Sequence, residues 1–168
     1  HPISGRSFTA EVPARQPTAM VAASLDPDAA ELAQSALSGD RFRVYTHDDL
    51  VGVELAGALK NVMAVATGIL EGVGLGNNSR AALITRGLAE MTRLGVSLGA
   101  RASTFAGLAG IGDLVLTCTG ALSRNRAVGL AVGEGRTLEE ALAGKPTVAE
   151  GVATTRSAVA LADREGVE

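Results

Sequence analysis

The chain has 168 residues, which suits one globular domain or one domain with part of another. Its net charge is −3 and it contains no basic run, so we expect neither nucleic acid nor an anionic membrane surface as its main partner. Aromatic residues make up only 2% of it, so the core must be built from alanine, valine, leucine and glycine, whose small side chains let helices approach closely.

Short strand and helix patterns alternate over residues 1–47, as in an α/β sheet domain. The expected elements are a strand ending at Ile3–Gly5, a short helix at Phe8–Arg15 broken by Pro13, a strand at Ala19–Ala23, a helix from Asp26 to about Leu37 and a strand at Phe42–Tyr45. Asp26 is the expected N-cap of the second helix, and Pro27 is its first helical residue. No earlier strand–helix units complete a sheet, so we interpret residues 1–47 as the last part of such a domain.

Residues 48–168 show helix patterns and no convincing strand, so the chain as a whole is predicted to be mainly α. The expected helices are Leu50–Leu70, Ser79–Leu98, Ala109–Cys118, Ser123–Val132, Thr137–Leu142 and Thr147–Arg164. Asn78 or Ser79 is expected to cap the second of these helices, and Ser123 the fourth. Thr137 and Glu140 have the spacing of a capping box at the start of the fifth.

The apolar segment Leu50–Leu70 is long enough to cross a bilayer. It carries Glu54, Lys60 and Asn61, which a lipid-exposed span resists, so we interpret it as the core helix of a soluble, cytoplasmic protein without stable membrane insertion. Cys118 is the only cysteine, which excludes an internal disulfide and a cysteine-cluster zinc site. We expect Cys118 to be a small buried residue, and we predict no metal site.

Lys60 is the most informative residue, because it is one of only two lysines and lies in a helix that is apolar on nearly every face. Burying an isolated charge is costly, so a buried ammonium must be paired with an anion, lose its proton, or have a role in the chemistry of a site. Desolvation also lowers the pKa of a buried lysine, which allows such a residue to donate and accept a proton near neutral pH. The alternative is a lysine whose stem lies along an apolar surface while its amino group reaches water.

The run Ser123–Arg126 opens a predicted helix with four polar residues. Free N–H groups and the helix dipole favour an anion at such a start, and an arginine adds a planar fork that matches a phosphate. Arg124 and Arg126 are two residues apart and cannot share a helix face, so at most one of them points inward. A capped and solvated helix start is the alternative interpretation.

Asp113 is a carboxylate among apolar residues and glycines. Asp113 has three possible roles: it caps the following helix, it hydrogen-bonds a hydroxylated ligand, or it pairs with Lys60. His1 and His47 have no partner in the sequence pattern, and we expect both to be structural or solvated.

Five motifs follow one another along the chain: Gly52–Asn61, Arg80–Met91, Gly110–Cys118, Ser123–Arg126 and Val148–Gly151. Together with Ser4–Val12 and Pro17–Ala19 they resemble the bacterial NAD(P)-dependent glycerol-3-phosphate dehydrogenases, and the resemblance covers essentially the whole chain.

The resemblance implies a Rossmann dinucleotide-binding domain, of which residues 1–47 are the C-terminal remnant. Residues 48–168 would form a helical substrate-binding and catalytic domain like that of 6-phosphogluconate dehydrogenases. The implied reaction is reversible hydride transfer between NAD(P)H and dihydroxyacetone phosphate, which gives sn-glycerol 3-phosphate for phospholipid synthesis. The implied partners are NAD(P) and a small phosphorylated substrate, and a homodimer is compatible with the resemblance.

The resemblance also implies roles for single residues. Lys60 is similar to the family's proton donor and acceptor at the substrate oxygen. Substrate contacts are implied for Gly5, Ser7, Lys60, Asp113, Ser123, Arg124 and Asn125, and cofactor contacts for Thr9, Arg124, Val148 and Glu150.

The chain also departs from the family pattern. The glycine-rich Rossmann fingerprint and a further substrate-contacting lysine are absent, and the family continues past Val167. Arg6 replaces a usual proline, and Thr9 a usual alanine. We therefore expect a fragment that is inactive alone. The alternative functions are a non-catalytic helical interaction domain and a related dehydrogenase that acts on another hydroxy substrate.

Overall fold

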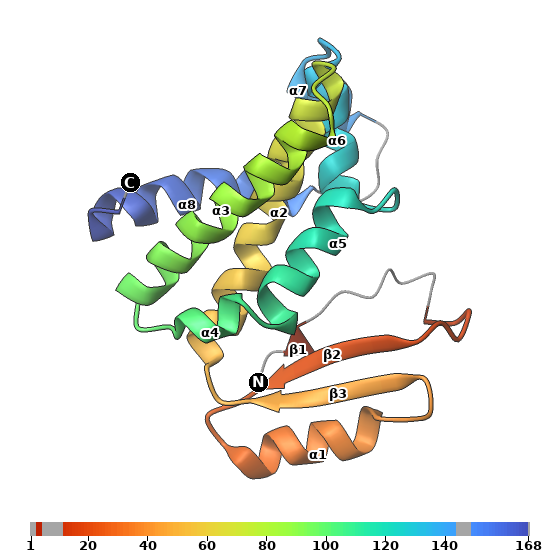
Figure 1. The fold of residues 1–168 in the computed structure, drawn as a ribbon, viewed down its shortest axis with the longest axis vertical. Coiled ribbons are helices and arrows are strands. Elements are labelled where there is room, and N and C mark those ends of the chain that lie inside the picture. The colour runs from red at the N-terminus through yellow and green to blue at the C-terminus, as the bar shows by residue number, and fades with distance from the viewer. Residues whose placement is uncertain (1–2, 5–11, 144–148, 168) are drawn as a thin grey trace.

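A computed structural model of the chain describes residues 3–4, 12–143 and 149–167. In chain order the elements are β1 (Ile3–Ser4), β2 (Thr18–Ala23), α1 (Pro27–Leu37), β3 (Phe42–His47), α2 (Leu50–Gly72), α3 (Asn77–Ser97), α4 (Ala102–Phe105), the π-helical turn η1 (Leu108–Gly112), α5 (Asp113–Thr119), α6 (Arg124–Gly133), α7 (Leu138–Leu142) and α8 (Glu150–Glu165). Figure 1 shows a small sheet with α1 on its outer side and the other helices gathered on the opposite side. The prediction of a mainly α chain is confirmed.

The sheet has the strand order β1-β2-β3, in which β1 is antiparallel to β2 and β2 is parallel to β3. The parallel pair runs in register from Thr18 opposite Phe42 to Ala23 opposite His47, and α1 is the crossover that joins its strands. α1 begins as predicted, because the Asp26 side chain accepts a hydrogen bond from the Asp28 N–H.

Of the short helix predicted at Phe8–Arg15 with a break at Pro13, the structure describes only residues 12–15, which are not helical. Residues 12–15 form a turn, and Arg15 has a φ of 56°. Pro13 lacks the N–H that a helix interior requires, which accounts for the turn. Residues 8–11 lie outside the described part of the chain.

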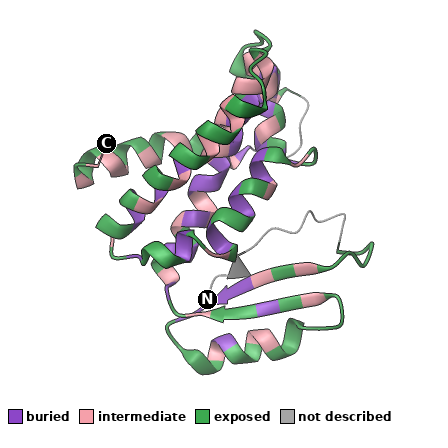
Figure 2. Cartoon of the chain, viewed as in Figure 1, coloured by how far each residue is buried: buried purple, intermediate pink, exposed green. Residues whose placement is uncertain are grey.

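Helix α2 is the centre of the molecule and packs against α3, α5, α6 and α8. Its N-cap is Asp49, whose carboxylate accepts a hydrogen bond from the Gly52 N–H at 2.9 Å. By length and composition α2 and the stretch Ala102–Thr119 are each able to span a membrane. Figure 2 shows many buried residues along α2 and α5, as expected for core helices of a folded domain.

Small residues let α2 and α6 approach backbone to backbone. A Cβ atom added to Gly68 of α2 would lie 2.1 Å from the carbonyl oxygen of Arg126, and one added to Gly129 of α6 would lie 2.0 Å from that of Val65. The expectation of close helix packing is confirmed for this pair.

Buried apolar residues form clusters on either side of the sheet–helix junction. Val21, Ala23, Val53 and Ala109 join β2 to α2 and η1. A larger cluster among the helices contains Ala56, Leu59, Ala64, Met91, Leu94, Ala100, Phe105, Leu114 and Cys118. Cys118 is fully buried, as predicted.

Several helix boundaries differ from the predictions. The expected helix Ala109–Cys118 is divided into η1 and α5, and α4 was not predicted. Helix α3 begins at Asn77 after Gly76 without a side-chain cap, so the predicted cap at Asn78 or Ser79 is wrong. The caps at Ser123 and Thr137 are confirmed. Helix α8 begins at Glu150, and Thr147 lies outside the described residues.

Candidate active site

Lys60 of α2 and Asp113 of α5 form a buried ion pair between Nζ and Oδ2. The side chains are only 4% and 2% exposed, respectively. The interpretation of Lys60 as a surface lysine whose amino group reaches water is therefore excluded. The Asp113 carboxylate compensates the buried ammonium charge, which would otherwise be strongly unfavourable in the core.

The position of Asp113 is set by the turn around it. It is the first residue of α5, directly after η1, and Gly112 takes the N-cap position. Asp113 therefore does not cap the helix that it opens. Thr117, one turn later, donates its hydroxyl hydrogen to the Asp113 backbone carbonyl at 2.6 Å and lies 3.2 Å from its Oδ1 atom. These contacts orient the carboxylate toward Lys60.

The start of α6 carries the polar motif. The Ser123 hydroxyl oxygen accepts a hydrogen bond from the Arg126 N–H at 3.3 Å, so this side chain caps the helix. Arg124 points toward solvent and forms an ion pair with Glu150 of α8 at 3.4 Å, with each side chain 44% exposed. The second arginine turns inward instead, to Glu71 near the end of α2. The two arginines thus face different directions, as their spacing predicted.

Asn125 connects this helix start to the lysine helix. Its Nδ2 atom donates to Oδ1 of Asn61 at 3.1 Å, and its Oδ1 atom accepts from the Gly151 N–H at 3.0 Å. The Asn125 side chain is completely buried. Because Asn61 follows Lys60 and Gly151 follows Glu150, these hydrogen bonds hold the starts of α6 and α8 against the middle of α2.

The structure thus gathers six of the predicted site residues around the middle of α2: Lys60, Asp113, Ser123, Arg124, Asn125 and Glu150. Gly5, Ser7, Thr9 and Val148 lie outside the described residues. Within the described ranges, no group of three or more histidine, cysteine and acidic side chains has the arrangement of a metal site.

Two polar residues of this site were not predicted. Asn61 was visible as a second polar residue in an apolar helix, and the burial argument made for Lys60 applies equally to it. Thr117 stands four residues after Asp113, a spacing that puts both on one helix face. By contrast, burial raises the pKa of the Cys118 thiol to about 11, so this residue offers no thiolate near neutral pH.

The arrangement combines a buried cation with a donor-rich helix start. A lysine ammonium can stabilise a developing negative charge on an oxygen and give it a proton. The α6 N-terminus with Arg124 offers N–H groups and a guanidinium to an anion. The half-exposed Arg124–Glu150 pair presents a cation and a hydrogen-bond acceptor side by side, which suits a ligand with phosphate and hydroxyl groups.

Residues 49–168 match the family model for the C-terminus of NAD-dependent glycerol-3-phosphate dehydrogenase. The chain is 61% identical over 166 residues to the glycerol-3-phosphate dehydrogenase [NAD(P)+] of Citrifermentans bemidjiense, covering 99% of this chain and 50% of that protein. It is 62% identical to the protein of the same name from Geobacter sulfurreducens, with the same coverage.

Solved structures show the same fold. The glycerol-3-phosphate dehydrogenase of Coxiella burnetii superposes with a TM-score of 0.96 at 50% identity, over 99% of this chain and 51% of that chain. The structure of DsGPDH of Dunaliella salina gives a TM-score of 0.88 at 26% identity, over 98% of this chain and 30% of that chain. The chain spans about half the length of the curated relatives it matches.

Proposed function

Because this chain belongs to the NAD-dependent glycerol-3-phosphate dehydrogenase family, we propose that it forms the substrate-binding and proton-transferring part of an NAD(P)-dependent enzyme. The reaction is the reversible reduction of dihydroxyacetone phosphate to sn-glycerol 3-phosphate, a precursor of phospholipids. The observation that carries the proposal is the buried Lys60–Asp113 pair, which joins α2 to α5 while α2 also packs against α6.

Lys60 is the proposed proton carrier. NAD(P)H, when bound, would provide the hydride that reduces the carbonyl carbon of the substrate. As the carbonyl oxygen gains negative charge, the Lys60 ammonium stabilises it and transfers a proton to it, and in the reverse direction the amine accepts the hydroxyl proton. Asp113, oriented by Thr117, holds the lysine side chain at this position and balances its charge.

The start of α6 is the proposed phosphate site. Ser123 uses its oxygen to cap the helix, so its hydroxyl hydrogen is directed away from the cap and suits a phosphate oxygen. Arg124 adds a guanidinium, and its exposure leaves it accessible to a ligand. Asn125, Gly5 and Ser7 remain predicted substrate contacts. For Asn125, the two hydrogen bonds inside the protein also favour a role in holding the site together.

NAD(P) fits the exposed side of this site. Arg124 suits a phosphate of the dinucleotide and Glu150 a hydroxyl or amide group, since the two side chains stand together at the surface. Thr9 and Val148 remain predicted cofactor contacts. In this proposal residues 1–47 are the end of the Rossmann domain and residues 48–168 the helical domain. The enzyme acts in the cytoplasm, and a homodimer is compatible with it.

The test is whether the full-length protein oxidises NADH or NADPH, which is measured as a loss of nicotinamide absorbance. We expect turnover with dihydroxyacetone phosphate and none with ketopantoate, and no turnover with the 168-residue chain alone. Turnover with ketopantoate only would favour a related dehydrogenase. A full-length protein without turnover on any hydroxy or keto substrate would favour a non-catalytic helical domain.

A further inference from the structure

The Ser123–Arg126 motif contains a second arginine that the proposed reaction does not use. Arg126 has a side chain only 15% exposed, and its guanidinium binds the Glu71 carboxylate near the end of α2. The Nε atom lies 3.0 Å from Oε2 of Glu71, and Nη2 lies 2.7 Å from Oε1. This is a two-point contact, which fixes the orientation of both side chains as well as their distance.

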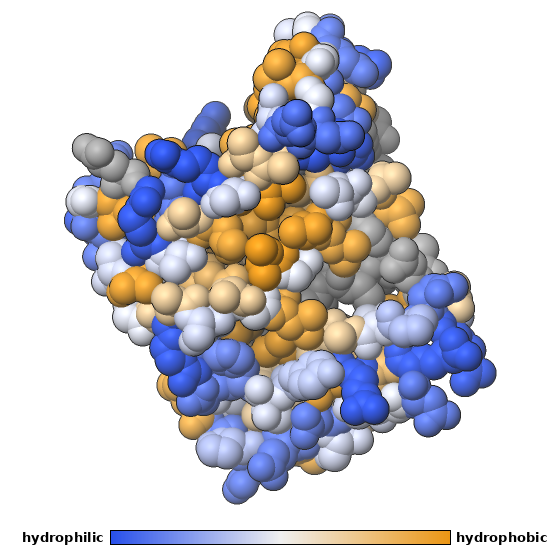
Figure 3. All heavy atoms as spheres, viewed as in Figure 1, coloured by the Kyte–Doolittle hydropathy of each residue, from blue (hydrophilic) through white to orange (hydrophobic). Residues whose placement is uncertain are grey.

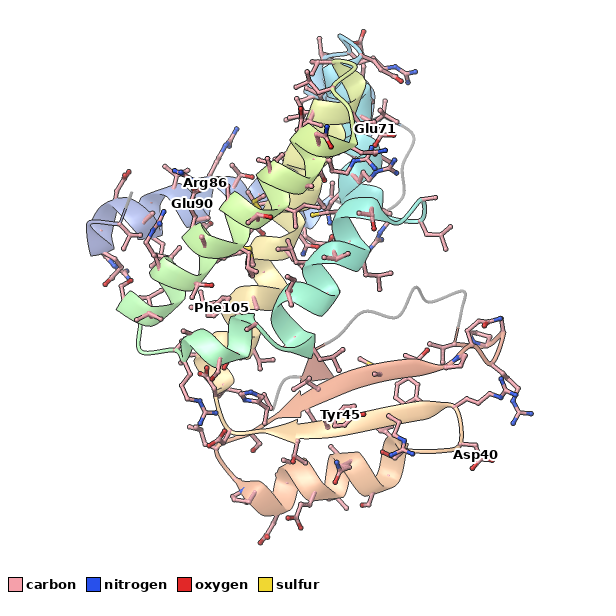
Figure 4. The ribbon with its side chains drawn as sticks, viewed as in Figure 1. Asp40, Tyr45, Glu71, Arg86, Glu90 and Phe105 are labelled. Atoms are coloured by element: carbon pink, nitrogen blue, oxygen red, sulfur yellow. The ribbon has the colours of Figure 1, made fainter. Side chains whose placement is uncertain are left out.

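A second guanidinium meets the same carboxylate. Arg80, in the first turn of α3, places Nη2 3.3 Å from Oε2 of Glu71. Glu71 therefore links α2, α3 and α6, and Figure 4 shows it at the end of α2 beside α6, remote from the sheet. With its charge engaged by Glu71, Arg126 is held away from the solvent side, where Arg124 lies.

The backbone of Arg126 is fixed as well. Its carbonyl oxygen lies against Gly68 of α2, so closely that a Cβ atom on that glycine would come within 2.1 Å. The first turn of α6 is therefore in direct backbone contact with α2 at this point. Ser123, Arg124 and Asn125 directly precede this fixed point, and their directions follow from it.

We infer that Arg126 is a positioning residue, which acts through Glu71 to aim the start of α6 at the substrate phosphate. This inference rests on the proposed function. Removing the ion pair would leave the chemistry at Lys60 intact but misplace the phosphate donors. A misplacement of about 1 Å can lower a rate by as much as roughly 100-fold. The value of kcat/KM would fall for the phosphorylated substrate and stay unchanged for a substrate without phosphate.

The experiment compares Glu71→Gln and Arg126→Lys in the full-length enzyme. Gln keeps the shape of Glu71 without its charge, and Lys keeps the charge of Arg126 without its fork. The control is Glu90→Gln, which breaks an exposed pair with Arg86 on α3 at 3.1 Å, labelled in Figure 4. For each enzyme, kcat/KM is measured with dihydroxyacetone phosphate and with dihydroxyacetone, and Tm is measured on the same preparation.

We expect both variants to lower kcat/KM for dihydroxyacetone phosphate by roughly tenfold, mainly through KM, while kcat/KM for dihydroxyacetone and the control stay at wild-type values. An equal loss for both substrates, or no loss, would overturn the inference. A lower KM of Glu71→Gln for dihydroxyacetone phosphate would also overturn the inference, because the released Arg126 would then be a direct ligand of the phosphate. A wild-type enzyme that fails to reduce dihydroxyacetone phosphate would overturn the proposed function, and this inference with it.

Discussion

The Lys60–Asp113 pair joins two charged residues that are each unfavourable alone in the core. From the sequence, Lys60→Met keeps the length and the apolar stem of the side chain, so helix packing is expected to survive. In the structure the same change leaves the Asp113 carboxylate buried without its cation. The stability of the fold and the chemistry of the site are therefore coupled at this residue.

A double substitution separates the two effects. We predict that Lys60→Met lowers the free energy of unfolding by about 3–5 kcal/mol, because it leaves an uncompensated buried charge. Lys60→Met combined with Asp113→Leu should recover most of that loss, since both charges are then replaced by apolar groups. Urea unfolding of the full-length protein measures this. If Lys60→Met had the same free energy of unfolding as the double variant, the buried pair would not form.

The site could be predicted from the sequence only in part. Lys60, Asp113 and Ser123 stand out because their polarity conflicts with apolar neighbours or marks a helix start. The hydrogen bonds of Asn125 to Asn61 and Gly151 join residues 64 and 26 positions apart. No local pattern carries such pairings, because they depend on how α2, α6 and α8 pack together.

At the scale of elements, one carboxylate ties the start of α2 to the start of α4, next to the apolar cluster that joins the sheet to the helices. The Asp49 side chain accepts hydrogen bonds from the Gly52 and Arg101 N–H groups at 2.9 and 2.8 Å, and from the Thr104 hydroxyl. Burial by itself would raise the pKa of Asp49, but these hydrogen bonds outweigh it and lower the pKa below its ordinary value of 3.8. His47 also has a partner here, since its Nδ1 atom accepts from the Asp49 N–H at 3.0 Å.

This arrangement predicts a sensitivity to acid. Because the folded-state pKa of Asp49 is depressed, its stabilisation is complete above pH 3.8 and is lost as the pH falls through the lower folded-state value. Asp49→Asn should therefore lower Tm at pH 6, and the difference from wild type should shrink below pH 3.8. Melting curves across this range provide the measurement. A difference that stays constant with pH would mean that the carboxylate charge does not contribute.

The glycine contact between α2 and α6 makes a second prediction at this scale. Gly129→Ala places a methyl group 2.0 Å from the Val65 carbonyl oxygen, so the helices must separate. We expect a loss of about 1–3 kcal/mol or more in unfolding free energy. Gly39→Ala is the matched control, because a Cβ atom there meets nothing within 4 Å. Equal effects of the two substitutions would contradict the close approach.

The helices themselves were predictable where apolar spacing and caps agree, as at α1, α6 and α7, and α2 was predictable from its apolar run alone. The π-helical turn η1 was not. Gly110 in this turn packs so closely on Phe105 that a Cβ atom would lie 2.1 Å from the Phe105 carbonyl oxygen. This contact joins residues only five positions apart and depends on the backbone conformation of the turn, which neither apolar spacing nor a cap residue signals; the same turn sets where Asp113 lies.

At the scale of the molecule, polar and apolar surface are unevenly distributed over the face that Figure 3 shows. Figure 3 shows apolar side chains gathered in the middle of the face, over the helices, and polar side chains over the sheet end. Exposed apolar residues on η1 and α5 include Leu108, Ile111 and Val115. The chain spans about half the length of its curated relatives.

The central claim is that Lys60 carries the proton. The most direct measurement is kcat of the full-length enzyme with Lys60→Met, using saturating dihydroxyacetone phosphate and NAD(P)H. The Lys60→Met/Asp113→Leu double variant is measured beside it, so that a loss of stability is not mistaken for a loss of chemistry. We predict that both lose at least about 10²–10⁴ in kcat, because general acid–base catalysis is removed. Turnover near the wild-type rate in either variant would contradict the account.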